Sequence, residues 1–326
     1  MKIKNLFLLA ALGLMASATL TSCEDVLGHW EKPSPNPITP GTVTPTVEEV
    51  IKYGFKVTDL AGVDRTEAVT SLKMSNDDAT VATAEVSGGK ITIKADDLKE
   101  ITTAMDFWFE AEIGGKPYVA KVNIDPATLS PETDKTLEMA TLGDVIKVDG
   151  KFYKAGTDGA VAKICYLGSE TAEAANGFNH GLALTLSDAN GGSTCNWKTE
   201  KTDAGHTKQT SSTFTEESGL QYNATHNTSE YLAFLAAIAN NGTTSPAGCS
   251  SWFLASCYQW TKILNANGIS KLLTTANGFE GMGSACHYWT SSERDADGAW
   301  YYSFPDACFA SDSKSYKFQV RSCLAF

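Results

Sequence analysis

The chain has 326 residues, of which 42% are apolar and 20% are charged. This composition is typical of folded globular proteins, it excludes a disordered, collagen-like or coiled-coil chain, and the length predicts two domains. The formal net charge is −12, and no segment interleaves basic and aromatic residues, so nucleic acid is not an expected partner.

The N-terminus has the features of an export signal. Lys2 and Lys4 precede an apolar run over residues 6–20, and Thr21, Ser22 and Cys23 follow at once. The run is too short to span a bilayer, which needs about 20 apolar residues. It therefore predicts a signal peptide over residues 1–22.

The end of this signal, Leu20-Thr21-Ser22-Cys23, resembles the bacterial lipobox, in which the cysteine receives diacylglycerol. The resemblance implies that Cys23 is the lipid-attachment residue; the alternative is an ordinary secretory signal in which Cys23 is incidental. Glu24 and Asp25 are similar to the surface-export signal of Bacteroidetes lipoproteins, although an Asp near this position can also mean inner-membrane retention. We expect a protein anchored to the outer membrane through lipid chains and exposed on the cell surface.

The segment after Cys23 is rich in proline. Five of the ten prolines lie between residues 33 and 45. Such a sequence favours extended polyproline II structure, so residues 23–46 are predicted to form a stalk.

Residues 47–127 alternate between apolar and polar side chains with the period of a β-strand. Paired glycines at 88–89 and 114–115 stand between alternating segments and predict two hairpins. The expected strands cover residues 53–58, 70–74, 81–86, 91–93, 107–113 and 118–124. We predict an all-β sandwich, Ig-like or fimbrillin-like, that acts as a spacer.

A turn-rich segment over residues 125–134 marks the boundary with a domain of mixed pattern over residues 140–326. A polar loop is expected over residues 190–217. Helices are expected over residues 231–238, with Thr228 as cap, and after the capping box that Ser256 and Gln259 form, with Gly268 as its stop. The expected strands of this domain are 145–148, 151–153, 160–167, 181–186, 288–290, 299–304 and 316–326.

Three C-terminal stretches carry a family resemblance: Ser250–Trp260, Tyr288–Glu293 with Ala299-Trp300, and Lys314 with Val320–Phe326. They resemble the G-W-[YF]-L-P-S, Y-W-[ST]-S-[ST]-E and K…V-R-x-V-x-A-F pattern of the Fibrobacter major paralogous domain. The resemblance implies an α+β, C-type-lectin-like domain over residues 140–326, of the kind shared with formylglycine-generating enzymes. The sequence departs from the pattern at Ala255 and Cys323.

The sequence lacks the groups that metal-dependent members of this fold use. Neither calcium-binding tripeptide of the sugar-binding lectins occurs, and the carboxylates of Asp295 and Asp297 are typical of a solvated turn. The copper-binding cysteine pair of the formylglycine-generating enzymes would need a partner for Cys323 at position 318, which is Phe318. We therefore expect no enzyme activity, no metal and no cofactor.

Seven cysteines follow Cys23, and an odd number leaves at least one of them free or paired with another chain. Cys165 and Cys323 lie among apolar residues and are interpreted as small buried hydrophobes. The alternative is a disulfide between them, because the resemblance implies that the terminal strands pair.

Two charged residues, Glu293 and Arg321, stand in otherwise apolar or hydroxyl-rich strands and are predicted to form a structural ion pair. The candidates for ligand binding are aromatic side chains that could stack on a sugar, although alternation places about half of them in the core. These candidates are Trp197, His287, Trp300 and Tyr301.

These observations predict a cell-surface lipoprotein whose head binds a glycan or a protein without metal, as an adhesin or accessory receptor. Two alternatives remain open. One is an enzyme on a formylglycine-generating-type scaffold that uses other residues, and the other is a structural subunit of a surface appendage.

Overall fold

The first described strands follow the alternation of the sequence. The computed structural model describes residues 52–76, 79–94, 103–125, 134–210, 214–266, 268–282 and 286–326. The predicted signal peptide, Cys23 and the proline-rich stalk lie outside the described residues. All described residues belong to one folded unit.

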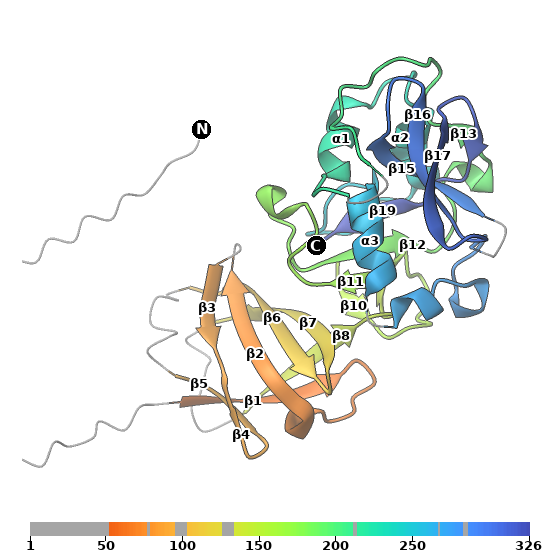
Figure 1. Cartoon of the computed structure of the whole chain (residues 1–326). Coiled ribbons are helices and arrows are strands. Elements are labelled where there is room, and N and C mark those ends of the chain that lie inside the picture. The colour runs from red at the N-terminus through yellow and green to blue at the C-terminus, as the bar shows by residue number, and fades with distance from the viewer. Residues whose placement is uncertain are drawn as a thin grey trace, which may run out of the picture. The chain divides into compact units, whose positions relative to one another are not determined.

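The N-terminal part forms a sheet in which eight strands are described (orange to yellow-green in Figure 1). In spatial order these are β3 (Ala79–Thr83), β2 (Val69–Asn76), β6 (Met105–Ile113), β7 (Lys116–Ile124), β8 (Lys135–Thr141), β1 (Lys52–Asp59), β5 (Lys90–Lys94) and β4 (Glu85–Ser87). The two end strands, β3 and β4, are consecutive in the chain and are joined by Ala84, whose N–H donates to Leu72 O of β2 at 2.9 Å. The sheet therefore curls until its two ends lie close together around one apolar core.

The predicted hairpin at Gly114-Gly115 is confirmed, with β6 and β7 antiparallel. Phe107 and Phe109 point into the core and are at most 1% exposed, whereas Trp108 and Glu110, which alternate with them along the strand, lie on the outer face. Part of the C-terminal chain packs against this outer face.

Strand β8 was not predicted. It falls between the two expected domains, 47–127 and 140–326, yet it joins the first sheet, parallel to β1 and antiparallel to β7. Leu137 and Met139 of β8 are fully buried in that sheet's core. The domain ranges otherwise stay a prediction.

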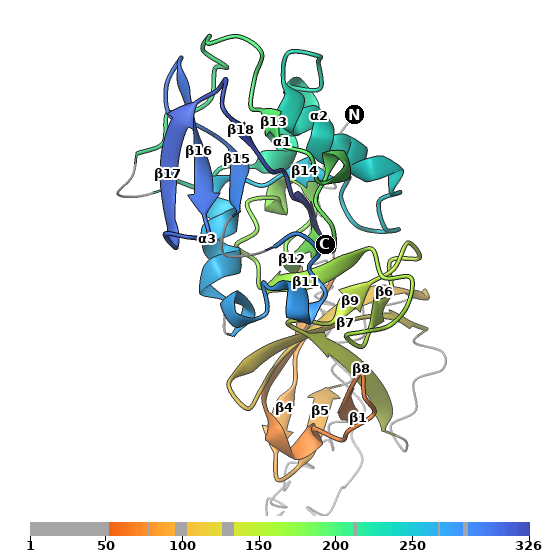
Figure 2. The same ribbon diagram turned by 90° about the vertical axis from the view of Figure 1, so that its right-hand side faces the viewer.

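The C-terminal part contains three further sheets in the described residues (green to blue in Figure 1). The largest has the order β10 (Phe152–Tyr153), β9 (Val145–Ile146), β11 (Ala162–Leu167), β12 (Gly181–Thr185), β19 (Ser322–Ala325) and β14 (Phe253–Leu254). A three-stranded sheet, seen side by side in Figure 2, consists of β15 (His287–Glu293), β16 (Gly298–Ser303) and β17 (Cys308–Ser313). A short pair is formed by β13 (Cys195–Asn196) and β18 (Lys317–Phe318).

Three α-helices are described, all in the C-terminal part: α1 (Gly219–Thr225), α2 (Leu232–Ala239) and α3 (Cys257–Asn265). The capping box at Ser256 and Gln259 is confirmed: the Ser256 hydroxyl accepts from the Gln259 N–H, and Gln259 Oε1 accepts from the Ser256 N–H at 2.9 Å. Helix α3 packs its apolar face between β11 and the sheet of β15 and β16.

Most described residues of the predicted surface loop over residues 190–217 are exposed, but several of its side chains are buried. Trp197, His206 and Gln209 are at most 5% exposed, because they pack under β15 and β16 instead of facing water. Helix α1, which follows this segment, was not predicted. The N-cap position of α2 is Tyr231 instead of Thr228, and its side chain makes no capping hydrogen bond. The structure is mostly β-sheet. No helix within the described ranges is long and apolar enough to cross a bilayer.

Candidate functional site

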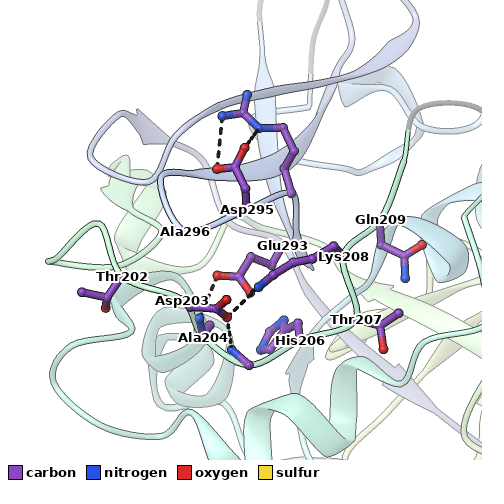
Figure 3. A network of polar contacts seen from close by, with 12 residues as sticks. Thr202, Asp203, Ala204, His206, Thr207, Lys208, Gln209, Glu293, Asp295 and Ala296 are labelled. Carbon is purple, nitrogen blue, oxygen red and sulfur yellow. Dashed lines mark hydrogen bonds and ion pairs between the residues drawn. The ribbon is translucent and has the colours of Figure 1, made fainter.

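A buried ionic network surrounds Glu293 at the end of β15 (Figure 3). Glu293 and Lys314 are both fully buried, and their side chains form an ion pair. The other carboxylate oxygen binds Lys208, which also pairs with Asp203 at 2.6 Å. The N–H of Ala204 donates to Glu293 Oε1 at 2.8 Å.

Lys314 ties this network to two further segments. Its ammonium donates to Thr202 O at 2.8 Å and to Ala296 O at 2.9 Å, and lies 5.1 Å from the centre of the Trp197 ring. Burial lowers the pKa of Lys314, and the Glu293 carboxylate opposes that shift. Each buried charge is therefore satisfied by protein groups, and the network fastens residues 202–208 to β15.

The predicted pairing of Glu293 with Arg321 is wrong. Arg321 is fully buried, but its partner is Asp188, 2.5 Å away, and it also donates to Thr185 O at 3.1 Å and Glu280 O at 2.6 Å. The two charges meet different neighbours because Glu293 ends β15, whereas Arg321 precedes β19 in the other sheet. The expectation that both charges would be buried and paired holds, but each has its own partner.

The predicted aromatic platform is wrong for Trp197 and Trp300. Trp197 is fully buried with its indole N–H donating to Thr290 O at 2.7 Å, and Trp300 is 5% exposed and donates to Gln209 O at 3.2 Å. His287 and Tyr301 are half-buried, with ring centres 5.3 and 4.4 Å from that of Phe318. These two rings pack on a neighbouring side chain, and their predicted contact with a ligand stays a prediction.

Several histidines and cysteines of the described chain are also held by packing. His206 stacks on Tyr222 at 3.6 Å, its Nδ1 faces Ser291 O at 3.0 Å, and its Nε2 lies 3.3 Å from that of His226. Burial, assisted by His226, lowers the pKa of His206 to about 3, so this ring is neutral at pH 7. Cys165 and Cys323 are both unpaired and fully buried, as the hydrophobe interpretation expects. Among the described residues, no group of three His, Cys, Asp or Glu side chains could hold a metal ion.

A cavity that the sequence did not reveal lies where the outer face of β6 meets the C-terminal part. We call it the junction cavity. Its volume is about 510 Å³, and it is lined by charged side chains and by the apolar Val119 and Leu167. Its charged side chains are those of Lys73, Glu110, Glu112 and, when protonated, His180.

Three of these side chains form a linked group. His180, 4% exposed, places Nδ1 2.7 Å from one oxygen of Glu110, and Lys73 binds the other oxygen. Burial raises the pKa of Glu110, but the hydrogen bonds from His180 and Lys73 outweigh it and lower that pKa overall. The cavity thus offers an ionised carboxylate, an ammonium that is 42% exposed and an apolar wall.

The wall behind this group is aromatic. Trp108 stacks on His180 with ring centres 4.2 Å apart, and Phe326 lies 6.1 Å from Trp108. The alternation of β6 indicated that Trp108 and Glu110 share the outer face, but no sequence pattern connected them with His180, 70 residues beyond Glu110.

The comparisons with known proteins give one distant similarity. No protein-family model matches the sequence, and no curated protein matches it. Among solved structures, the chain is similar to a fimbrial protein from Bacteroides ovatus, with a TM-score of 0.45 and 11% identity, over 84% of this chain and 69% of the other. The resemblance to the Fibrobacter major paralogous domain therefore stays a prediction.

Proposed function

We propose that this protein is a lipid-anchored surface protein that binds a glycan without metal, and that the junction cavity is its binding site. The observation that supports this proposal is the cavity itself, which brings an exposed ammonium, a carboxylate and an apolar wall together. In the same proposal, Cys23 carries the lipid, the first sheet acts as a spacer, and the C-terminal part has a C-type-lectin-like fold.

The volume and lining of the cavity favour a small, uncharged, hydroxyl-rich ligand. About 510 Å³ lies within the usual range for small-molecule sites. Lys73 and Glu110 neutralise each other, and Glu112 adds a further negative charge that disfavours an anionic ligand. Sugar hydroxyls, by contrast, can donate to a carboxylate and accept from the ammonium. Val119 and Leu167 supply the apolar surface that the C–H face of a sugar covers.

A second cavity of about 600 Å³ shares His180 with the first and is lined by Trp108, Asp106 and Asn123. The two cavities adjoin at His180, which stacks on Trp108. This arrangement favours a ligand with two or more sugar units over a monosaccharide.

The test is a glycan and mucin array probed with the full mature chain. Lys73→Ala is the informative variant, because Lys73 lines the cavity and its side chain is 42% exposed. Lys94→Ala, an exposed lysine of β5 that lines neither cavity, is the matched control. We expect Lys73→Ala to weaken the strongest array signals at least tenfold, Lys94→Ala to leave them unchanged, and EDTA to have no effect.

Two outcomes would contradict the proposal. Equal signals for Lys73→Ala and the natural chain would place binding elsewhere. The absence of any glycan signal would refute glycan binding itself.

A further inference from the structure

A third cavity, of different chemistry, adjoins Lys163 in the middle of the six-stranded sheet. Lys163 on β11 faces Val145 of β9 and Leu184 of β12 in the sheet register. The residue is only 7% exposed. Its ammonium donates to Asn277 O and lies 5.2 Å from the centre of the Phe279 ring.

This ammonium has no carboxylate partner among the residues that the structure describes. Asp144 acts on Lys163 through its charge but forms no ion pair with it; its carboxylate accepts from the Thr141 N–H at 2.9 Å and the Ala155 N–H at 3.1 Å. Burial lowers the pKa of Lys163, and the charge of Asp144 only partly offsets this. A buried charge without a counter-charge is costly, which distinguishes Lys163 from the paired Lys314 and Arg321.

Lys163 opens onto a cavity of about 440 Å³, which we call the Lys163 cavity. Its walls come from β9, from the turn at residues 155–160 and from the turn at residues 276–278. Of the described residues that line it, Lys163 alone is charged, whereas the junction cavity carries both signs. The chain has a net charge of −12, so the electrostatic potential of a cavity with a single positive charge differs in sign from that of most of the molecule.

The ammonium has unused donors on the cavity side. Gly278 lines the cavity beside Lys163 with φ +84°, the left-handed conformation that ends the turn at Thr275–Asn277. An ammonium has three N–H donors, and the structure uses one of them on Asn277. Two N–H donors of Lys163 therefore remain for a ligand.

We propose that the Lys163 cavity binds the carboxylate of a small organic acid, of the size of a sugar acid. One ammonium neutralises one negative charge, and no arginine or second lysine lines the cavity in the described chain, so a monoanion fits better than a phosphate dianion. The site goes beyond the proposed glycan binding, because it lies in a different cavity and selects for charge.

The test compares D-glucuronate with D-glucose, which differs from it in lacking the carboxylate, and with inorganic phosphate. Binding to the full mature chain is measured by titration calorimetry. We expect glucuronate to bind at least tenfold more tightly than either of the other two.

Lys163→Met is the decisive variant, and Lys154→Met, an exposed lysine on the turn before the cavity, is its matched control. Methionine keeps the length of the side chain and removes the uncompensated charge, so this variant should melt no lower than the natural chain and should lose glucuronate affinity at least tenfold. Lys154→Met should keep that affinity.

The proposal is overturned if glucuronate binds no better than glucose, if phosphate binds as tightly as glucuronate, or if Lys163→Met binds glucuronate like the natural chain. A lower melting temperature for Lys163→Met would assign the lysine a structural role and would equally overturn it. Because Lys73→Ala leaves the Lys163 cavity untouched, failure here is distinguishable from failure of glycan binding at the junction cavity.

Discussion

Replacement of Glu293 by glutamine should destabilise the protein strongly. The substitution keeps the shape of the side chain but removes its charge, and it leaves the ammonium of Lys314 fully buried without its counter-ion. Removing one member of a buried ion pair costs about 3–5 kcal/mol. For domains of 150–250 residues each kcal/mol lowers the melting temperature by about 2–4 °C, so the expected drop is about 6–20 °C.

The assay is thermal unfolding followed by circular dichroism, with Glu85→Gln as the matched control. Glu85 pairs with Lys52 at 2.6 Å, but both side chains are at least 40% exposed, and pairs of this kind contribute about 0–1 kcal/mol. A drop for Glu293→Gln no larger than that for Glu85→Gln would refute the reasoning.

Double-mutant cycles identify the side chain that forms an ion pair with Glu293. Glu293→Gln combined with Lys314→Met should cost less than the sum of the single changes, because the second substitution removes the charge that the first leaves unpaired. Glu293→Gln combined with Arg321→Met should be additive to within about 0.5 kcal/mol, because Arg321 pairs with Asp188. The reverse result would restore the pairing predicted from the sequence.

Four further predictions follow. Cys23→Ala should move the protein from the membrane fraction to the soluble fraction, and unchanged partitioning would contradict lipidation. The stability difference between the natural chain and Glu110→Gln should be largest above pH 4.5 and should shrink as pH falls through the lowered pKa of Glu110, measured by urea unfolding. Lys163 holds fewer protons when folded than when unfolded, so its contribution to stability should rise with pH between its lowered pKa and 10.5, a slope absent in Lys163→Met. Gly181→Ala should destabilise by about 1–3 kcal/mol, because a Cβ would lie 2.4 Å from the Phe326 ring; an unchanged melting temperature would contradict this contact.

Local patterns of the sequence predicted local structure well. The hairpin at Gly114-Gly115 and the capping box at Ser256 depend on residues a few positions apart, and both are present. Strand β8 was missed although Leu137 and Met139 alternate with polar residues, because a turn-rich segment precedes it and no hairpin partner stands beside it in the sequence. Its pairing with β1 joins strands about 80 residues apart, which no local signal reveals.

The partners of buried charges were less predictable than their burial. Glu293 and Arg321 stand in strands whose other residues are apolar or carry hydroxyl groups, and this pattern indicated correctly that both charges are buried and paired. Lys314, by contrast, lies in the turn between β17 and β18, where a lysine normally faces water. The junction cavity was equally invisible, because Lys73 and Glu110 come from two strands of one sheet and His180 comes from a loop far along the chain.

The short strands at the ends of the sheets limit how copies of this chain could join into a fibre by strand exchange. In the described sheets, the end strands β3, β4, β10, β13, β14 and β18 have five residues or fewer, and β3 and β4 lie close to each other where the sheet curls. β15 is longer, but its outer side is already engaged by Gln319 and Ala255. Strand β17 remains: it has six residues, of which Cys308 is exposed and the other five are half-buried, and it is paired on one side by β16. Because a donated strand needs a row of backbone groups to pair with, a partner strand would have to add at Cys308–Ser313, and a proline at Ala310 would block it.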